Sequence, residues 1–153
     1  VLFRSKIKNE ELWDIDLDVL APSAIENVIT KDNASKIKAK IILEMANGPT
    51  TNEADAILNE NGKIVIPDIL ANAGGVVVSY FEWIQNRTAI SRSLEEVDRD
   101  LKKMMVDATG KVAALHQQHS ISNRTAAYVL ALKRINDANA CLGNKGYFSR
   151  GIK

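Results

Sequence analysis

Two segments rich in asparagine and glycine contain the residue types best suited to binding a small ligand. One is ANGPT at residues 46–50, and the other is NAGG at residues 72–75. Glycine allows a ligand to approach the backbone closely, and an asparagine carboxamide offers both a hydrogen-bond donor and an acceptor. This lining suits a flat ligand that carries an amide of its own. Each segment taken alone is more typical of a turn or of tight helix packing.

Both segments follow short apolar runs that predict buried strands. The runs are residues 17–21, 39–44 and 63–66. A helical turn or two is predicted around residues 24–36, and a capped helix is predicted at 51–61. Short apolar strands that alternate with helices indicate a parallel sheet with right-handed crossovers. Ligands bind beyond the carboxyl ends of such strands, so the residues after each strand are expected to meet at one edge of the sheet.

The remainder of the chain predicts long helices. Apolar residues spaced three and four apart favour helices over residues 76–85, 94–118 and 123–138. In the second of these, a run of charged residues fills the other face, which predicts a solvated surface. The final helix is expected to end near Gly143. The sequence therefore predicts an α/β fold, with about three parallel strands followed by C-terminal helices.

Composition limits the class of protein. The 153 residues are 46% hydrophobic and 25% charged, which is typical of one globular domain. The net charge of +1 gives no overall field that favours nucleic acid or an anionic membrane. The sequence has no apolar run long enough to span a bilayer, no visible secretory signal and a single cysteine, Cys141. These features predict a soluble, cytoplasmic protein without nucleic-acid or membrane partners.

The combination of motifs is far more specific than either segment alone. ANGPT, PDILANAGG and VVVSYFEWIQN occur in this order, preceded by DVLAPSAIENVIT and followed by NRTAAYVLALKRI. Together they resemble the glutamate dehydrogenase family over nearly all of residues 12–138. The related leucine, phenylalanine and valine dehydrogenases share NAGG, but the helix after it does not usually read SYFEW in them. The resemblance therefore favours glutamate as the substrate.

The resemblance implies a partial Rossmann-like, doubly wound sheet. Residues 6–90 would form the C-terminal half of a dinucleotide-binding domain, and residues 91–153 would form a C-terminal helical segment. Residues 1–5 are excluded from this division, because Val-Leu-Phe-Arg-Ser matches the translated end of a common sequencing adapter and is expected to be an artefact.

Contacts with NAD or NADP are implied for five residues. Ser23 and Ala24 would lie along the nicotinamide-ribose side of the cofactor, and Asn47, Gly48 and Asn72 would lie near the nicotinamide and its ribose. Ser23 departs from the family, which commonly has alanine there. A second departure is Met45, where the family often has glycine.

Contacts with glutamate are implied for Val76 and Ser79, with the Ser79 hydroxyl on the distal carboxylate. The two residues are three apart, so they share one helix face. A hydroxyl near a helix start, with free amides and a favourable dipole, suits a carboxylate. An isolated helix serine more often bonds back to a backbone carbonyl.

The implied reaction is the reversible oxidative deamination of L-glutamate to 2-oxoglutarate and ammonia, in a full-length enzyme that is a hexamer. The family's catalytic lysine and aspartate come from an N-terminal substrate domain and have no match here. The chain also has no GxGxxG phosphate-binding turn. We therefore assign no catalytic residue, and we expect the chain alone to be inactive.

Two alternatives remain open. The chain could be a fragment of a leucine, phenylalanine or valine dehydrogenase, or a non-catalytic binding or assembly module that uses its helix surfaces. No metal site is assigned, because His116 and His119 lack a third ligand and are expected to be exposed. Tyr80, Phe81 and Trp83 indicate aromatic packing or a subunit interface.

Overall fold

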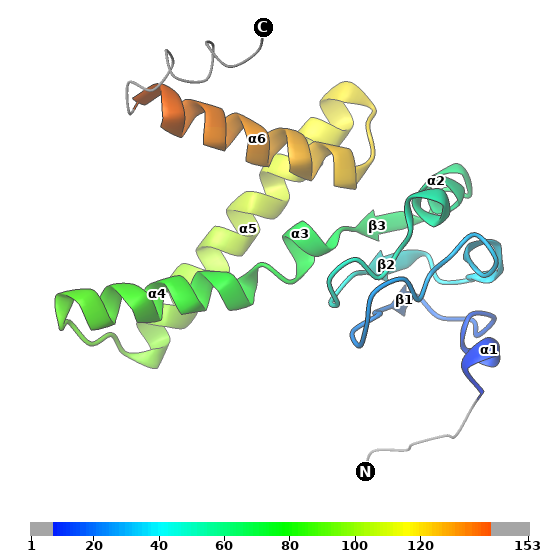
Figure 1. Ribbon diagram of the computed structural model, residues 1–153, viewed down its shortest axis with the longest axis horizontal. Helices are drawn as coiled ribbons and strands as arrows, with labels where there is room; N and C mark the ends of the chain where they lie inside the picture. The colour runs from blue at the N-terminus through cyan, green and yellow to red at the C-terminus, as the bar shows by residue number, and fades with distance from the viewer. Residues whose placement is uncertain (1–7, 142–153) are drawn as a thin grey trace, which may run out of the picture.

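The computed structural model describes residues 8–141 and arranges them as a small sheet that leads into three long helices (Figure 1). The artefact expected at residues 1–5 and the helix end expected near Gly143 lie outside the described residues. The elements in chain order are α1 (Asn9–Leu12), β1 (Val19–Leu20), η1 (Ala34–Lys36), β2 (Ile41–Leu43), α2 (Asn52–Glu60), β3 (Ile64–Ile66), α3 (Asp68–Ala71), α4 (Gly74–Thr88), α5 (Leu94–His119) and α6 (Asn123–Cys141).

The three strands form one parallel sheet in the order β1-β2-β3, which confirms the predicted α/β class. Each strand is shorter than the apolar run that predicted it. Hydrogen bonds from Ile64 N to Lys40 O (2.9 Å) and from Ile41 N to Asp18 O (3.1 Å) continue the pairing beyond the strand bounds. The difference is therefore confined to the strand ends.

The connection between β1 and β2 is mostly irregular. The helical turn or two predicted around residues 24–36 corresponds to the short 3-10 helix η1. The Asn33 side chain accepts a hydrogen bond from Thr30 N (2.8 Å) and donates one to Val28 O (2.8 Å). Short polar side chains that bond to nearby backbone in this way compete with helical hydrogen bonds. Ile29 instead forms an isolated parallel bridge with Thr50.

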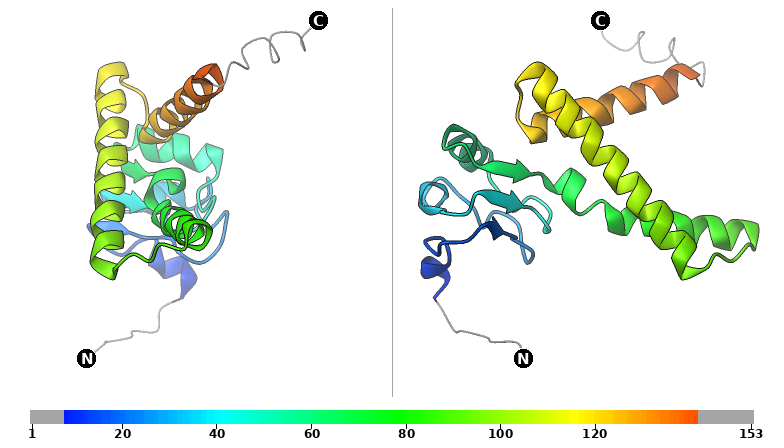
Figure 2. Two further views of the ribbon diagram at one scale, coloured as in Figure 1. Left: turned by 90° about the vertical axis from the view of Figure 1, so that its left-hand side faces the viewer. Right: turned by 180° about the vertical axis from the view of Figure 1, so that it is seen from behind.

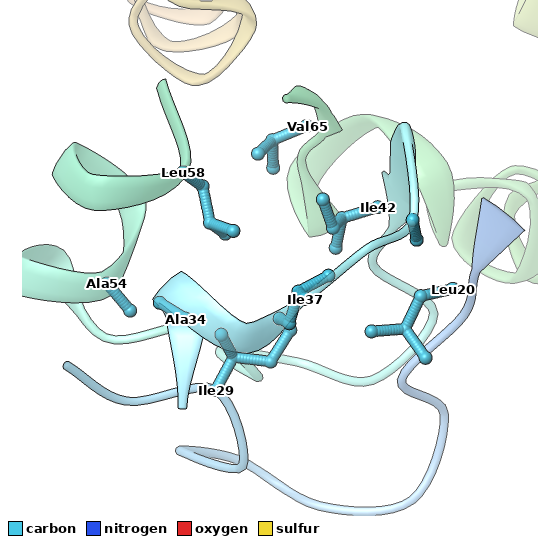
Figure 3. Close-up of a cluster of buried hydrophobic side chains, with 9 residues drawn as sticks. Leu20, Ile29, Ala34, Ile37, Ile42, Ala54, Leu58 and Val65 are labelled. Atoms are coloured by element: carbon cyan, nitrogen blue, oxygen red, sulfur yellow. The ribbon is translucent and has the colours of Figure 1, made fainter. Parts of the chain in front are cut away.

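The main core lies between the sheet and its connections (Figure 3). Ile42 at the centre of β2, Leu58 on α2 and Ile29 are fully buried. The predicted helix at residues 51–61 is confirmed as α2, and the Thr51 side chain caps it by accepting a hydrogen bond from Ala54 N (3.3 Å). This core fixes the sheet on which the candidate site is built.

The three C-terminal helices are confirmed. α5 contacts both α4 and α6, and the right-hand view of Figure 2 shows it crossing between them. Ser93 and Glu96 form a reciprocal capping box at the start of α5. A second, smaller core contains Leu70, Val112, Ala126 and Ala127, which joins α3 to α5 and α6.

The charged face predicted for α5 is exposed, as expected. Its six predicted residues are Glu95, Glu96, Asp98, Arg99, Lys102 and Lys103. Over residues 8–141, none of the helices has both the length and the apolar character required to cross a bilayer.

Candidate functional site

A wide cleft of about 1100 Å³ lies beside the carboxyl ends of the strands. Its walls come from three stretches of chain, which follow β1, β2 and β3, and from the first turns of α4. The predicted convergence of these segments is therefore confirmed. The lining residues are Ala24, Ile25, Glu26, Asn27, Met45, Ala46, Asn47, Asn72, Gly75, Val76 and Ser79.

Asn47 and Asn72 form the polar centre of the cleft. Asn72 Nδ2 donates to Asn47 Oδ1 at 2.6 Å and to the carbonyl oxygen of Met45 at 3.3 Å. Among the described residues, no hydrogen bond occupies the amide nitrogen of Asn47 or the side-chain oxygen of Asn72. The pair thus offers one donor group and one acceptor to a ligand, which matches the needs of a planar carboxamide.

Gly48 fixes the turn that carries Asn47, and it does so with a left-handed backbone (φ +56°). Its amide donates to Asp68 Oδ2 (2.8 Å), and its carbonyl oxygen accepts from Asn27 N (2.8 Å). The Gly48 amide is therefore committed within the protein, and Gly48 does not line the cleft. The cofactor contact implied for Gly48 stays a prediction, and the Gly48 amide is already bonded to Asp68.

Ser23 also lies outside the lining, whereas its neighbour Ala24 is part of it. The Ser23 hydroxyl donates to Ala21 O (2.9 Å), two residues earlier in the chain. The serine that replaces the family's alanine thus bonds locally. Met45, the second departure, lines the cleft beside Asn47 and is 43% exposed, so its side chain contributes an apolar surface to the lip.

The α4 wall presents Val76 and Ser79 on one helix face, as predicted, and Val76 is 75% exposed. Ser79 is the sixth residue of α4, one turn beyond the free amides at the helix start. Its hydroxyl donates to Gly75 O at 3.0 Å, the back-bond typical of helix serines. The hydroxyl must leave this bond to donate to a carboxylate.

The two glycines at the start of α4 face different neighbours. A Cβ added to Gly74 would lie 3.6 Å from Leu101 Cδ1, so this glycine faces α5. Gly75 lines the cleft and has nothing within 4 Å of such a Cβ. Gly75 alone borders the space available to a ligand.

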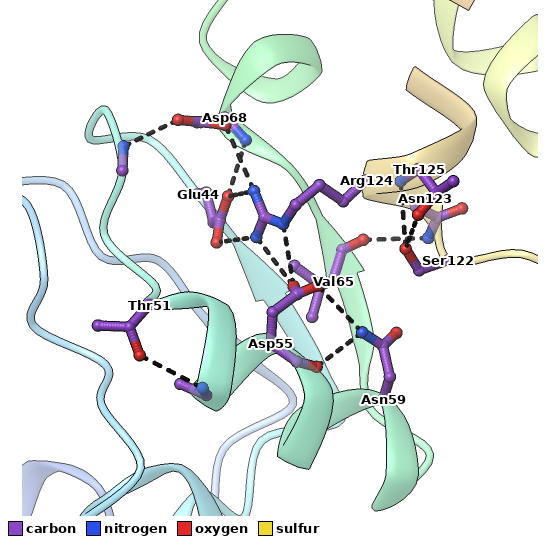
Figure 4. Close-up of polar contacts among 12 residues, drawn as sticks. Glu44, Thr51, Asp55, Asn59, Val65, Asp68, Ser122, Asn123, Arg124 and Thr125 are labelled. Carbon is purple, nitrogen blue, oxygen red and sulfur yellow. Dashed lines mark hydrogen bonds and ion pairs between the residues drawn. The ribbon is translucent and has the colours of Figure 1, made fainter. Parts of the chain in front are cut away.

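A buried ionic cluster lies behind the cleft and was not predicted from the sequence (Figure 4). Arg124, in the first turn of α6, contacts Glu44, Asp55 and Asp68, and we call these four residues the Arg124 cluster. Two parallel hydrogen bonds of 3.0 and 2.6 Å join its guanidinium to Glu44, which is fully buried. Asp55 Oδ1 accepts from Arg124 Nε at 3.0 Å, and Asp68 Oδ1 lies 3.5 Å from Nη1.

The cluster keeps Arg124 charged. Burial by itself would lower the pKa of Arg124, but the hydrogen bonds that Arg124 donates to Glu44 and Asp55 outweigh it and raise that pKa above its ordinary value. One signal in the sequence pointed to this cluster. Glu44 directly follows an apolar strand, where a carboxylate is stable only if it is paired.

The other residues singled out in the sequence do not join the cleft. His116 and His119 are exposed, as predicted, and His116 Nδ1 lies 2.6 Å from Ile121 O. No group of three potential metal ligands occurs among residues 8–141. Phe81 is buried, while Tyr80 and Trp83 stack on the surface of α4 with ring centroids 6.2 Å apart.

The fold and the cleft define a class of protein, in which an open parallel α/β sheet places a ligand cleft at the carboxyl ends of its strands. A family model described as Glutamate/Leucine/Phenylalanine/Valine dehydrogenase matches residues 3–143. The chain therefore belongs to the glutamate/leucine/phenylalanine/valine dehydrogenase family.

Individual relatives include both cofactor types. The NADP-specific glutamate dehydrogenase of Synechocystis sp. is 49% identical over 94% of this chain and 33% of its own length. The NAD-specific glutamate dehydrogenase of Staphylococcus aureus is also 49% identical, over 90% of this chain and 33% of its own length. The chain thus spans about a third of the length of these relatives.

Solved structures of glutamate dehydrogenases share the fold. The hetero-hexameric enzyme from Thermus thermophilus, in a leucine-bound form, has a TM-score of 0.84 and 29% identity, and the match covers 100% of this chain and 35% of that one. The enzyme from Peptoniphilus asaccharolyticus has a TM-score of 0.75 and 42% identity over 80% of this chain and 31% of that one.

Proposed function

We propose that this chain forms the nicotinamide end of the cofactor site and one wall of the amino-acid site in a glutamate dehydrogenase. The proposed reaction is the reversible, NAD- or NADP-dependent oxidative deamination of L-glutamate to 2-oxoglutarate and ammonia. The observation that carries the proposal is the convergence of Asn47, Asn72, Val76 and Ser79 on one cleft from segments far apart in the sequence.

The cofactor fits the polar groups of the cleft. The unused amide of Asn47 and the unused oxygen of Asn72 complement the acceptor and donor of a nicotinamide carboxamide. Ala24 adds a small surface beside them, where a ribose would lie. When bound, the cofactor supplies the hydride chemistry, and these residues bind and orient its ring.

The glutamate side chain is placed on the α4 wall. Val76 would contact its methylene groups, and the Ser79 hydroxyl would donate to its distal carboxylate after it leaves the Gly75 carbonyl. A hydrogen bond to a charged group in such a site contributes about 1.5–3 kcal/mol. A free-energy contribution of this size is large enough to favour glutamate over an apolar amino acid of similar length.

The proton chemistry must come from elsewhere in the enzyme. Among the described residues, the cleft lining contains Glu26 as its single ionisable side chain, and no lysine. We therefore expect the chain alone to give no change in absorbance at the reduced-nicotinamide wavelength when it is mixed with glutamate and NAD or NADP. Clear turnover by the isolated chain would contradict the proposal that the proton-transfer groups lie in another part of the enzyme.

The complete reaction can be tested with a hybrid enzyme, in which this chain replaces the matching 33% of the Synechocystis relative. We expect the hybrid enzyme to oxidise glutamate in preference to leucine and phenylalanine, as measured by kcat/KM for each. A preference for leucine or phenylalanine would favour the other branch of the family. A folded hybrid without turnover on any of the three would favour a binding or assembly module.

We also propose a cytoplasmic location and assembly into a hexamer for the whole enzyme. The hexameric state draws support from the Thermus thermophilus neighbour, which is itself hetero-hexameric. The exposed Tyr80 and Trp83 on α4 supply an aromatic surface of the kind that subunit interfaces use. Light scattering of the hybrid enzyme measures its assembly directly.

A further inference from the structure

The Arg124 cluster continues beyond its ion pairs to the polar centre of the cleft. Glu44 Oε2, which accepts a hydrogen bond from Arg124, also accepts one from Asp68 N at 2.9 Å. Asp68 in turn accepts the amide of Gly48 at 2.8 Å through its other carboxylate oxygen, Oδ2. A continuous path of charge-assisted hydrogen bonds thus runs from α6 to the turn that carries Asn47.

Each link in this path restricts the next. Glu44 is fully buried and cannot move without leaving a charge unpaired, so it holds the backbone of Asp68 in one place. The Asp68 carboxylate then holds the Gly48 amide, next to Asn47 in the chain. Asn72 lies four residues after Asp68 and bonds to Asn47 from the same segment. Asp68 therefore contacts both of the segments that carry the two asparagines.

We propose that Asp68, held in place by Arg124 through Glu44, is a positioning residue for Asn47. The inference deepens the proposed function, since it concerns how the amide that would meet the nicotinamide is oriented. Asp68 does not line the cleft, so its carboxylate would act on the ligand through the Gly48 turn.

Asp55 provides a matched control. Like Asp68, it is a carboxylate in the first turn of a helix and it contacts Arg124, at 3.0 Å. Unlike Asp68, it makes no hydrogen bond to Gly48 or to any residue that lines the cleft. A purely structural role of the cluster predicts similar consequences for Asp55→Ala and Asp68→Ala. The positioning role predicts different ones.

The first test measures the kinetics of the hybrid enzyme. We expect Asp68→Ala to lower kcat/KM for the cofactor by up to about 100-fold, since a misplaced reactive group can cost that much, while Asp55→Ala stays within about threefold. In combination with Asn47→Ala, Asp68→Ala should add nothing further, because both changes remove the same oriented amide. Equal losses in the two aspartate variants, or losses that multiply with Asn47→Ala, would overturn the inference.

The second test needs no turnover and uses the 153-residue chain. The Gly48 amide should exchange its proton slowly, and Asp68→Ala should accelerate that exchange about tenfold more than Asp55→Ala does. A Gly48 amide that exchanges freely in the unmodified chain, or equally fast in the two variants, would overturn the inference. If the hybrid enzyme prefers another amino acid, the proposed substrate fails, but the exchange measurement still decides whether Asp68 holds the turn.

Discussion

The sheet region (residues 8–73) and the helical region (residues 74–141) bury their apolar side chains to different extents. The core of the sheet region contains nine buried residues, with Ile29, Ile42 and Leu58 fully enclosed. The helical region shares a buried core of four, and it leaves large side chains such as Trp83 and Leu132 more than half exposed. The sheet region therefore has its own core, while the helical region retains apolar surface for contacts with other chain segments.

The Arg124 cluster is the strongest polar link between the two regions, so its removal should have the largest effect. We expect Arg124→Ala to lower the free energy of unfolding by about 3–5 kcal/mol, because it leaves the fully buried Glu44 unpaired. Arg134→Ala is the matched control on the exposed side of α6 and should change the free energy of unfolding by less than about 0.5 kcal/mol. Urea denaturation of the two variants checks this, and a similar loss in both would mean that the regions are joined in another way.

Core substitutions should show the difference in burial directly. Ile42→Ala in the sheet region is expected to lower the free energy of unfolding by about 2–5 kcal/mol, because the loss of a fully buried side chain leaves a cavity. Leu132→Ala in the helical region removes a side chain that is 64% exposed and should cost less than about 0.5 kcal/mol. Thermal denaturation of the pair is the measurement, and comparable losses would remove the distinction between the regions.

Helix caps allow a comparison with the same chemistry in both regions. Thr51 caps α2 in the sheet region, and Ser93 caps α5 in the helical region; each accepts a backbone amide at 3.3 Å. We expect Thr51→Ala and Ser93→Ala each to lower the free energy of unfolding by about 0.5–2 kcal/mol. Circular dichroism during urea unfolding measures the loss of helix in each variant. An unchanged urea midpoint for Ser93→Ala would contradict the capping role of Ser93.

The smallest expected effect is a dependence on pH in the helical region. The hydrogen bond from Arg92 lowers the pKa of Asp100 from its ordinary value of 3.8, so the folded state favours the charged form. The contribution to stability is therefore present above about pH 4 and is lost as pH falls through the lower pKa of the folded state. The difference in Tm between the unmodified chain and Asp100→Asn should shrink from pH 6 to pH 2. A difference in Tm that stays constant over this pH range would contradict a lowered pKa of Asp100 in the folded state.

The sequence predicted the elements whose signals are local. Apolar runs located three strands, Thr51 located the start of α2, and spacing located the three long helices. It also predicted that Asn47 and Asn72 lie close together, because parallel strands present their carboxyl ends at one edge, whereas Val76 and Ser79 were implied by the family resemblance. These predictions succeeded because each depends on periodicity, caps or topology within a short window.

The remaining features depend on contacts that no local pattern encodes. Arg124 meets Glu44 across 80 residues of sequence, and the pairing becomes evident only when α6 packs against the sheet. No local pattern showed that the Gly48 amide is bonded to Asp68, 20 residues later in the chain. The connection before β2 was predicted to hold a helical turn or two and has one 3-10 turn, because the local bonds of Asn33 compete with helical hydrogen bonds.

The proposed contact between the Ser79 hydroxyl on α4 and the distal carboxylate of glutamate carries the assignment of the substrate. The most direct measurement is kcat/KM for glutamate in Ser79→Ala of the hybrid enzyme, with the cofactor KM as the internal control. We expect a loss of about 10- to 100-fold for glutamate and a cofactor KM within about twofold, because a hydrogen bond to a charged group is removed while Asn47 and Asn72 stay in place. An unchanged kcat/KM for glutamate would contradict the proposed contact.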